Sequence, residues 1–142
     1  MTNAHVGADF ERVAAKYFAA EGIILTQNYK VLVGFHTKKK HAFDPGSASP
    51  KILVECKSHK WTADGKVPGA KMTTWNEAMY YFHLAPEGYR KIFFILRHGR
   101  SENGETLLRY YQRIYAHLIP ADVEFIEWNE LSGVAIPHPK MT

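Results

Sequence analysis

The sequence contains almost no cysteine and no long apolar segment. Cys56 is its one cysteine, which excludes an internal disulfide and a cysteine-rich zinc site. The longest uninterrupted apolar run covers only residues 92–96, whereas a membrane-spanning helix needs about 20 such residues. The eight histidines lack the HExxH spacing of zinc enzymes, and the amphipathic start of the chain, with Asp9 and Glu11, does not resemble a secretory signal. We therefore expect a soluble intracellular protein of the cytoplasm, with no membrane partner.

Length and composition indicate one domain covering residues 1–142. Apolar residues make up 46% of the chain and aromatic residues 13%, which is enough to fill one core. Charged residues make up 23%, a share that excludes a disordered or fibrous chain. A chain of 142 residues leaves little room for a second domain.

Positive charge is concentrated in one stretch of the chain. Residues 30–71 hold nine lysines and only three acids, a local charge of +6, whereas the whole chain carries +4. Binding of a polyanion such as nucleic acid is one explanation, because each neutralised phosphate releases counterions. A solvated surface is the other explanation, and charge alone favours it.

The order of predicted elements is typical of an α/β domain whose mixed sheet is covered by helices on both faces. We predict a helix over 4–20, strands over 28–35 and up to Asp44, a loop over 45–50, and a strand over 51–57. A loop over 60–70 follows, then a helix to about residue 83 that starts at the loop or at Thr74, which has capping-box spacing to Glu77. The remaining elements are a strand over 91–96, a helix over 107–118, a strand over 123–128 and an extended tail from Gly133.

Charged residues interrupt the apolar strand 51–57. Glu55 and Lys57 are two residues apart, so they project from the same face of this strand. If the strands before and after the 45–50 loop are neighbours, Asp44 approaches Glu55, and two close carboxylates repel unless a cation lies between them. Mg²⁺ suits that position, and Lys57 beside it would orient a water or offset charge at a phosphorus atom. The alternative is a surface ion pair between Glu55 and Lys57.

Asp44, the loop after it and Glu55-Cys56-Lys57 together resemble the PD-(D/E)xK nuclease superfamily, which has the restriction-endonuclease-like fold. The family core is a helix, a three-strand meander, a helix and a strand (αβββαβ). Our predicted elements match it over residues 4–97, and a C-terminal helix-strand extension with the tail covers 98–142. The family's leading proline is absent, because Phe43 precedes Asp44.

The resemblance implies a metal-dependent endonuclease that hydrolyses phosphodiester bonds of nucleic acid, with DNA the expected substrate. It implies Mg²⁺ held by Asp44, Glu55 and the backbone carbonyl of Cys56, with Mn²⁺ able to substitute. Lys57 matches the catalytic lysine, and Glu11 matches an acidic residue that many members carry in the first helix. Asp44, Glu55 and Lys57 should therefore converge on one cleft, with Glu11 at its rim. A homodimer would allow two strands to be cut.

Candidate contacts to nucleic acid lie around the motif strand. Lys60, Lys66 and Lys71 lie on or near the predicted loops and could contact phosphates, although a solvated position explains them equally well. Asn76-x-x-x-Tyr80 is similar to a Gln-x-x-x-Tyr pair found in some branches of the family. Other residues are expected in ordinary roles: three lysines (38–40) in a solvated turn, His59 at the surface, Glu77 as a helix cap, Cys56 and Trp75 in the core.

Two alternatives remain open at this point. One is a module that has the nuclease-like fold and binds nucleic acid without cutting it. Two carboxylates where phosphates bind argue against that interpretation, because they would repel the ligand. The other is a structural protein in which Glu55 and Lys57 form only an ion pair, and it predicts no binding of divalent metal.

Overall fold

The computed structural model describes residues 3–138. The elements, in chain order, are α1 (Asn3–Ala20), β1 (Tyr29–Val33), β2 (Lys39–Phe43), β3 (Gly46–Ala48), β4 (Lys51–Lys57), α2 (Gly69–Leu84), β5 (Arg90–Leu96), α3 (Leu107–Ile114), the short 3₁₀ helix η1 (Ala116–Leu118), β6 (Val123–Asn129) and β7 (Val134–His138). Within these residues, no helix combines the length and apolar character needed to cross a membrane.

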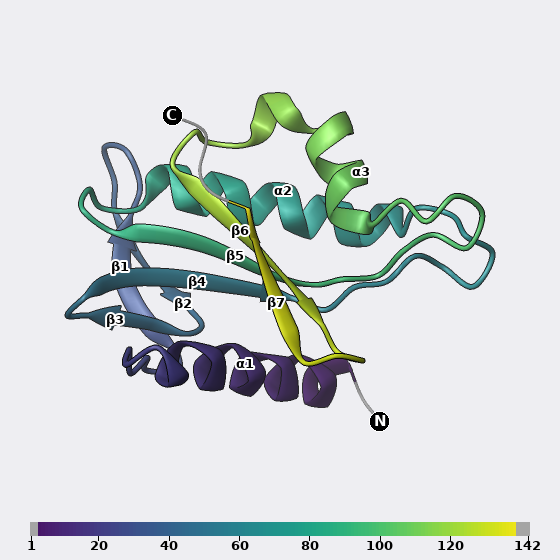
Figure 1. Ribbon diagram of the computed structural model, residues 1–142. Helices are drawn as coiled ribbons and strands as arrows, with labels where there is room; N and C mark the ends of the chain where they lie inside the picture. Colours follow the sequence, from purple (N-terminus) through teal and green to yellow (C-terminus); the bar gives the residue numbers. More distant parts are fainter. Residues whose placement is uncertain (1–2, 139–142) are drawn as a thin grey trace.

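A five-stranded mixed sheet forms the centre of the fold, in the order β3-β4-β5-β6-β7. The three inner strands are parallel, while β3 and β7 run antiparallel at the two edges. Helix α1 covers one face of the sheet, and α2 and α3 cover the other (Figure 1). The predicted α/β class and the mixed sheet with helices on both faces are confirmed.

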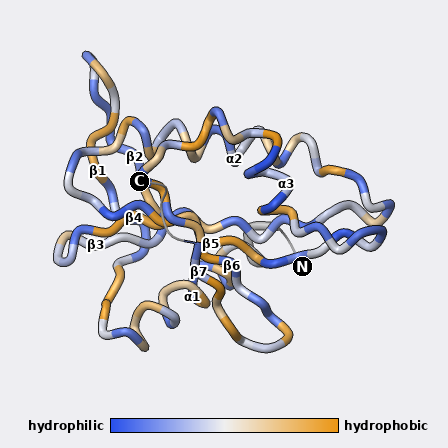
Figure 2. Tube along the Cα trace, turned by 45° about the horizontal axis from the view of Figure 1, so that its top comes forward, coloured by the Kyte–Doolittle hydropathy of each residue, from blue (hydrophilic) through white to orange (hydrophobic). Residues whose placement is uncertain are grey.

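Strand alternation divides the core into two layers. Leu53 of β4 packs on the α2 side, whereas Ile52 and Val54 pack on the α1 side. Strand β5 is buried on both faces, as its uninterrupted apolar sequence predicts for a central strand. Trp75 is fully buried in the α2 layer, which confirms its predicted place in the core. Figure 2 shows hydrophobic residues along the central strands and hydrophilic ones in the long loops beyond them.

The predicted loop 45–50 contains the additional strand β3. It pairs antiparallel with β4, with Gly46 opposite Leu53 and Ala48 opposite Lys51. The predicted three-strand meander is therefore divided: β1 and β2 form their own antiparallel ribbon, and β3 takes the edge of the main sheet. A three-residue edge strand bracketed by prolines has no apolar alternation to reveal it.

Three element boundaries differ from the prediction. Helix α2 begins at Gly69, and the Thr74 hydroxyl donates to the Lys71 carbonyl inside the helix, so the predictions of a start at Thr74 and of Glu77 as a cap are wrong. Helix α3 ends at Ile114 and continues only as a 3₁₀ turn rather than as one helix to residue 118. The tail from Gly133 is extended as predicted, but it is also hydrogen-bonded to β6 as strand β7.

Candidate active site

The turn before β3 brings Asp44 close to Glu55. The backbone N–H of Val54 donates to the Pro45 carbonyl at 2.9 Å, which continues the β3–β4 register one step beyond Gly46 and Leu53. Asp44 precedes Pro45 in the turn between β2 and β3, so this hydrogen bond brings it close to Glu55 at the end of the β3–β4 pair. The two predicted metal ligands are therefore neighbours in the fold.

Helix α1 adds a third carboxyl group to this pair. The Glu11 carboxyl lies near enough to Asp44 to donate a hydrogen bond to it when Glu11 is protonated. Burial, that hydrogen bond and the negative charges of Asp44 and Glu55 together raise the pKa of Glu11 to about 7. Glu11, Asp44 and Glu55 thus form a cluster, called here the carboxylate cluster, in which negative charge is poorly compensated.

The backbone fixes the position of Asp44. Its Oδ1 accepts a hydrogen bond from the Asn28 backbone N–H at 2.9 Å. Two residues away along each segment, Thr26 and Gly46 exchange two backbone hydrogen bonds of 2.7 and 2.9 Å. A Cβ on Gly46 would lie 2.7 Å from the Tyr29 ring, so only glycine allows this close approach. The segment before β1 therefore anchors the turn that carries Asp44.

Lys57 follows Glu55 on the same face of β4 and is half-buried. Within the described residues, the ion-pair contact of Glu55 is with His41, at 3.8 Å, and none joins Glu55 to Lys57. The ion pair that the structural alternative requires is therefore not formed. Cys56 points to the opposite face and packs against the α1 layer, where burial raises the pKa of its thiol well above the usual value.

His41 and Tyr81 also lie beside the carboxylate cluster, and no pattern in the sequence predicted that they would. The His41 ring is stacked on the Tyr81 ring, with centroids 3.6 Å apart and planes at 8°. The Nε2 of His41 is buried without a hydrogen-bond partner in the described part of the chain and lies 3.8 Å from the Glu55 carboxylate. A lone histidine on a short strand has no motif that could have identified it.

The face of α2 directed toward Glu55 therefore carries Tyr81. Glu77 lies one turn before Tyr81, on the same helical face. Asn76 instead accepts a hydrogen bond from the Tyr111 hydroxyl at 2.8 Å, at the contact of α2 with α3. Tyr80 is exposed and packs beside Phe35 of the β1–β2 turn. The structure thus separates Asn76 and Tyr80 from the carboxylate cluster.

His59 continues the face of β4 that carries Glu55 and Lys57, and it is half-buried rather than at the surface as predicted. The Trp75 indole N–H donates to its Nδ1 at 2.8 Å. Because an indole nitrogen can only donate, the proton of neutral His59 resides on Nε2. Burial and the charges of Lys57 and Lys71 lower the pKa of His59 to about 4. A neutral N–H donor is therefore held next to Lys57.

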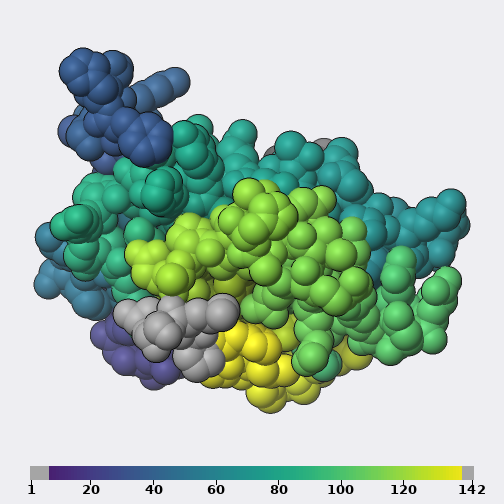
Figure 3. Space-filling view, turned by 90° about the horizontal axis from the view of Figure 1, so that it is seen from above, coloured from purple at the N-terminus to yellow at the C-terminus, as the bar shows by residue number. Residues whose placement is uncertain are grey.

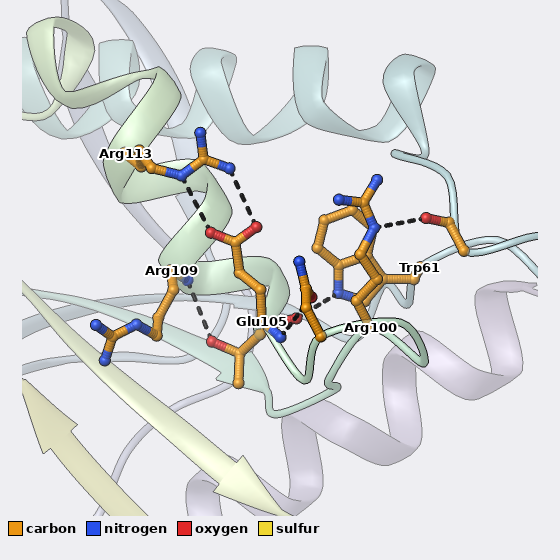
Figure 4. A network of polar contacts seen from close by, with 8 residues as sticks. Trp61, Arg100, Glu105, Arg109 and Arg113 are labelled. Atoms are coloured by element: carbon orange, nitrogen blue, oxygen red, sulfur yellow. Dashed lines mark hydrogen bonds and ion pairs between the residues drawn. The ribbon is translucent and has the colours of Figure 1, made fainter.

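The loop after β4, which carries Lys60 and Lys66, is braced against the loop after β5. Arg100 stacks over the Trp61 ring at 4.3 Å and donates to the Gly65 carbonyl at 2.7 Å. The Trp61 indole N–H donates to the Glu105 carbonyl at 3.0 Å, and the Glu105 side chain pairs with Arg113 of α3 (Figure 4). This loop pair is called here the braced loops.

The three predicted phosphate-contacting lysines differ in setting. Lys60 is half-exposed and lies 3.5 Å from the Glu130 carboxylate, so part of its charge is already compensated. Lys66 is exposed on the braced loops. Lys71 is exposed in the first turn of α2, and its charge contributes to the lowered pKa of His59.

The donor set of the carboxylate cluster fits a hard divalent cation. All its donors are oxygens, and Mg²⁺ is commonly held by one or two carboxylates plus water and substrate phosphate. Burial is the main reason why the pKa of Glu11 is raised, and the charges of Asp44 and Glu55 add a smaller repulsive part that such a cation would relieve. Within residues 3–138, no group of three or more histidine, cysteine or acidic side chains is arranged so that it could hold a metal ion. An ion at this place would be held by Asp44 and Glu55, with solvent and the Cys56 carbonyl completing its ligands.

Comparison of the chain with protein-family models, with curated proteins and with solved structures gives no match. Function is therefore inferred from the geometry and charge of the carboxylate cluster and the residues around it.

Proposed function

We propose that this protein is a metal-dependent endonuclease of the PD-(D/E)xK superfamily that hydrolyses phosphodiester bonds of nucleic acid, with DNA as its substrate. The observation that carries the proposal is the convergence of Asp44, Glu55 and Glu11, from three separate elements, beside a Lys57 that is not paired with Glu55. The order of α1, the β1–β2 ribbon, β3, β4, α2 and β5 is compatible with a restriction-endonuclease-like core.

Each residue of the site has a distinct task in this proposal. A bound Mg²⁺ supplies an activated water and compensates charge on the phosphate. Asp44 and Glu55, with the Cys56 carbonyl, hold the ion, and the Asn28 N–H keeps Asp44 oriented. Lys57 orients the attacking water and stabilises negative charge that develops on the phosphate oxygens. Glu11 positions Asp44 through their hydrogen bond.

A module that binds nucleic acid without cutting it is the main alternative. The lysines of residues 30–71 would serve such a module equally well. Its difficulty is the carboxylate cluster, because three acidic side chains beside a bound phosphate weaken binding unless a cation separates them. The two functions differ in one observable, the appearance of a metal-dependent product.

The test is a cleavage assay on duplex, single-stranded and branched DNA and RNA with Mg²⁺ or Mn²⁺, and with EDTA as the metal-free control. Glu55→Gln and Lys57→Ala should each reduce cleavage by about 100-fold or more. Lys51→Ala, on the same face of β4 at its other end, and Glu21→Gln, just beyond the end of α1, are matched controls that should keep full activity. Unchanged cleavage in Glu55→Gln and Lys57→Ala, or no product from any substrate, would refute the proposal.

A further inference from the structure

The β1–β2 ribbon extends from the body of the protein as a basic projection. Residues 29–43 contain four lysines and no acidic residue. All four lysines are exposed: Lys30, Lys38, Lys39 and Lys40. Figure 3 shows this ribbon projecting outward from the rest of the surface beside α2.

An exposed aromatic cluster lies where this projection meets the C-terminal end of α2. Phe35 is 66% exposed and Tyr80 is 54% exposed. The Phe35 ring centroid lies 6.2 Å from that of Tyr80 and 6.1 Å from that of His83. Large rings exposed to this extent contribute little to the core, so their grouping at one place indicates a binding surface.

The turn that presents Phe35 is held in a defined conformation. Gly34 has a φ of 134°, and a Cβ at this position would lie 2.3 Å from the Thr37 carbonyl oxygen, so glycine is required. The Lys38 ammonium group donates to the Gly34 carbonyl at 3.1 Å. The Gly34 N–H donates to the Leu84 carbonyl at 3.5 Å, which ties the turn to the end of α2. The aromatic cluster is therefore displayed by an ordered turn.

Between the turn and α2 lies an open groove with a volume of about 450 Å³. Phe35, Lys38 and Leu32 line its side on the ribbon. His83 and Glu87 line its side on α2 and the turn that follows. The groove thus combines aromatic and apolar surface with the lysines of the ribbon at its edge.

We infer that this groove binds an unpaired base of a single-stranded or branched nucleic acid, with Phe35 stacked on the base and the lysines of the turn contacting the neighbouring phosphates. Every base has a π-face, so stacking on an exposed aromatic residue in a basic groove is the usual way in which proteins hold single strands. The inference rests on the proposed function for its biological role, since it names the part of the substrate that the nuclease would engage.

The groove is connected to the carboxylate cluster by one strand. Strand β2 runs from Lys39 to Phe43 and leads directly into Asp44. At about 3.3 Å per residue, Lys38, which lines the groove, lies roughly 20 Å from Asp44 along the chain. That separation corresponds to a few nucleotides of a single strand. An unpaired base in the groove would thus place a nearby phosphodiester bond within reach of the metal ligands.

Charge favours nucleic acid over a protein occupant. A second copy of this chain or another protein would use Leu32 and Phe35 as apolar anchors, and neither anchor depends on the lysines. The four exposed lysines of the ribbon outnumber the one acid that lines the groove, Glu87, so this surface is complementary to a polyanion. The two occupants also differ in what they require at position 35, since an apolar interface accepts leucine whereas base stacking needs an aromatic ring.

Binding is measured by fluorescence anisotropy in EDTA, so that cleavage cannot interfere. The probes are a labelled single strand of about 15 nucleotides containing 2-aminopurine and a blunt duplex of the same sequence. Phe35→Ala and Phe35→Leu should each weaken single-strand binding by about tenfold and abolish the quenching of 2-aminopurine, whereas Phe35→Trp should retain both. Leu131→Ala, at a site that is 96% exposed elsewhere on the surface, is the control and should bind normally.

Single-strand binding that is unaffected by Phe35→Ala, or that is retained in Phe35→Leu, would overturn the inference. So would a change from dimer to monomer in Phe35→Ala without a change in DNA binding, because the groove would then be an interface between copies. Phe35-dependent binding without any metal-dependent cleavage would support the inference and refute the nuclease proposal. Metal-dependent cleavage together with single-strand binding that Phe35→Ala leaves unchanged would support the nuclease proposal and refute the inference about the groove.

Discussion

The protonation of His59 offers a direct test of the geometry around Lys57. Burial and the charges of Lys57 and Lys71 lower the pKa of His59 from 6.5 to about 4. Its Nδ1 accepts the Trp75 indole N–H, so a second proton has no free position at that nitrogen. Between pH 6.5 and 4 the unfolded chain therefore binds a proton at this residue that the folded protein does not bind. By linkage, the free energy of unfolding must fall as the pH decreases through this range.

The size of this effect follows from the difference between the two pKa values. A pKa lowered from 6.5 to about 4 corresponds to at most about 3–4 kcal/mol. Because His59 is only half-buried and its neighbouring charges are screened by solvent, we expect about 1–2 kcal/mol. For a chain of this length, that is a decrease of about 3–6 °C in Tm. The contribution is fully present above pH 6.5 and is lost at pH 4.

The measurement compares the wild-type protein with His59→Asn, in which the amide oxygen can accept the same indole hydrogen bond without titrating. Thermal or urea unfolding between pH 7 and 4.5 gives the difference in unfolding free energy, in which other titrating groups cancel. His36→Asn, at an exposed position on the β1–β2 turn, controls for the substitution itself. A difference that stays constant with pH would refute the reasoning, as would an NMR titration of His59 with a pKa near 6.5.

Three further predictions concern the carboxylate cluster and its supports. Because the pKa of Glu11 is raised to about 7, its ionised form destabilises the fold, and the stability of the wild-type protein falls as the pH rises from 4.5 toward 7. In thermal melts with EDTA, Glu11→Gln should therefore stabilise the protein by about 1 kcal/mol at pH 8 and should have no effect below pH 4.5. Gly46→Ala should lower the free energy of unfolding in urea by about 1–3 kcal/mol, because its Cβ would lie 2.7 Å from a carbon of the Tyr29 ring. Gly7→Ala in α1 is the control, because its Cβ would meet no atom within 4 Å and should not destabilise the protein. Arg100→Ala should speed hydrogen exchange in the loop after β4 by releasing its stacking and hydrogen bond, while Arg97→Ala, exposed nearby, should leave exchange unchanged.

The parts of the fold that the sequence predicted are those with a strong local pattern. Strand β5 follows directly from an apolar run that only a doubly covered strand accommodates. Helix α2 follows from the helical spacing of Trp75, Met79 and Phe82. Strand β3 could not be predicted, because it is stabilised by backbone hydrogen bonds to β4 and not by an apolar pattern of its own. For the same reason, nothing in the sequence shows that β1 and β2 leave the main sheet.

The residues of the candidate site also differ in whether a local sequence pattern could predict their positions. The proximity of Asp44 and Glu55 could be expected, because a short connection between neighbouring strands constrains both. The contact of His41 with Tyr81 joins residues far apart in the chain and depends on how α2 is rotated over the sheet. A helix turns by about 100° per residue. The motif-like pair Asn76 and Tyr80 therefore faces away from the carboxylate cluster, while the next residue along from Tyr80 faces it.

The distribution of charge along the chain has a structural explanation in this arrangement. Strand β2 begins with lysines and ends next to Asp44. Strand β4 contains Glu55 and Lys57, and the braced loops that follow it contain Lys60 and Lys66. The basic excess of residues 30–71 thus lies on two extensions that leave the carboxylate cluster in different directions, the β1–β2 ribbon and the braced loops (Figure 1). A polyanion bound to both extensions would cross the cluster, where the acidic side chains would repel it. Because a divalent cation removes that repulsion, the same arrangement that attracts nucleic acid also makes its productive binding depend on metal.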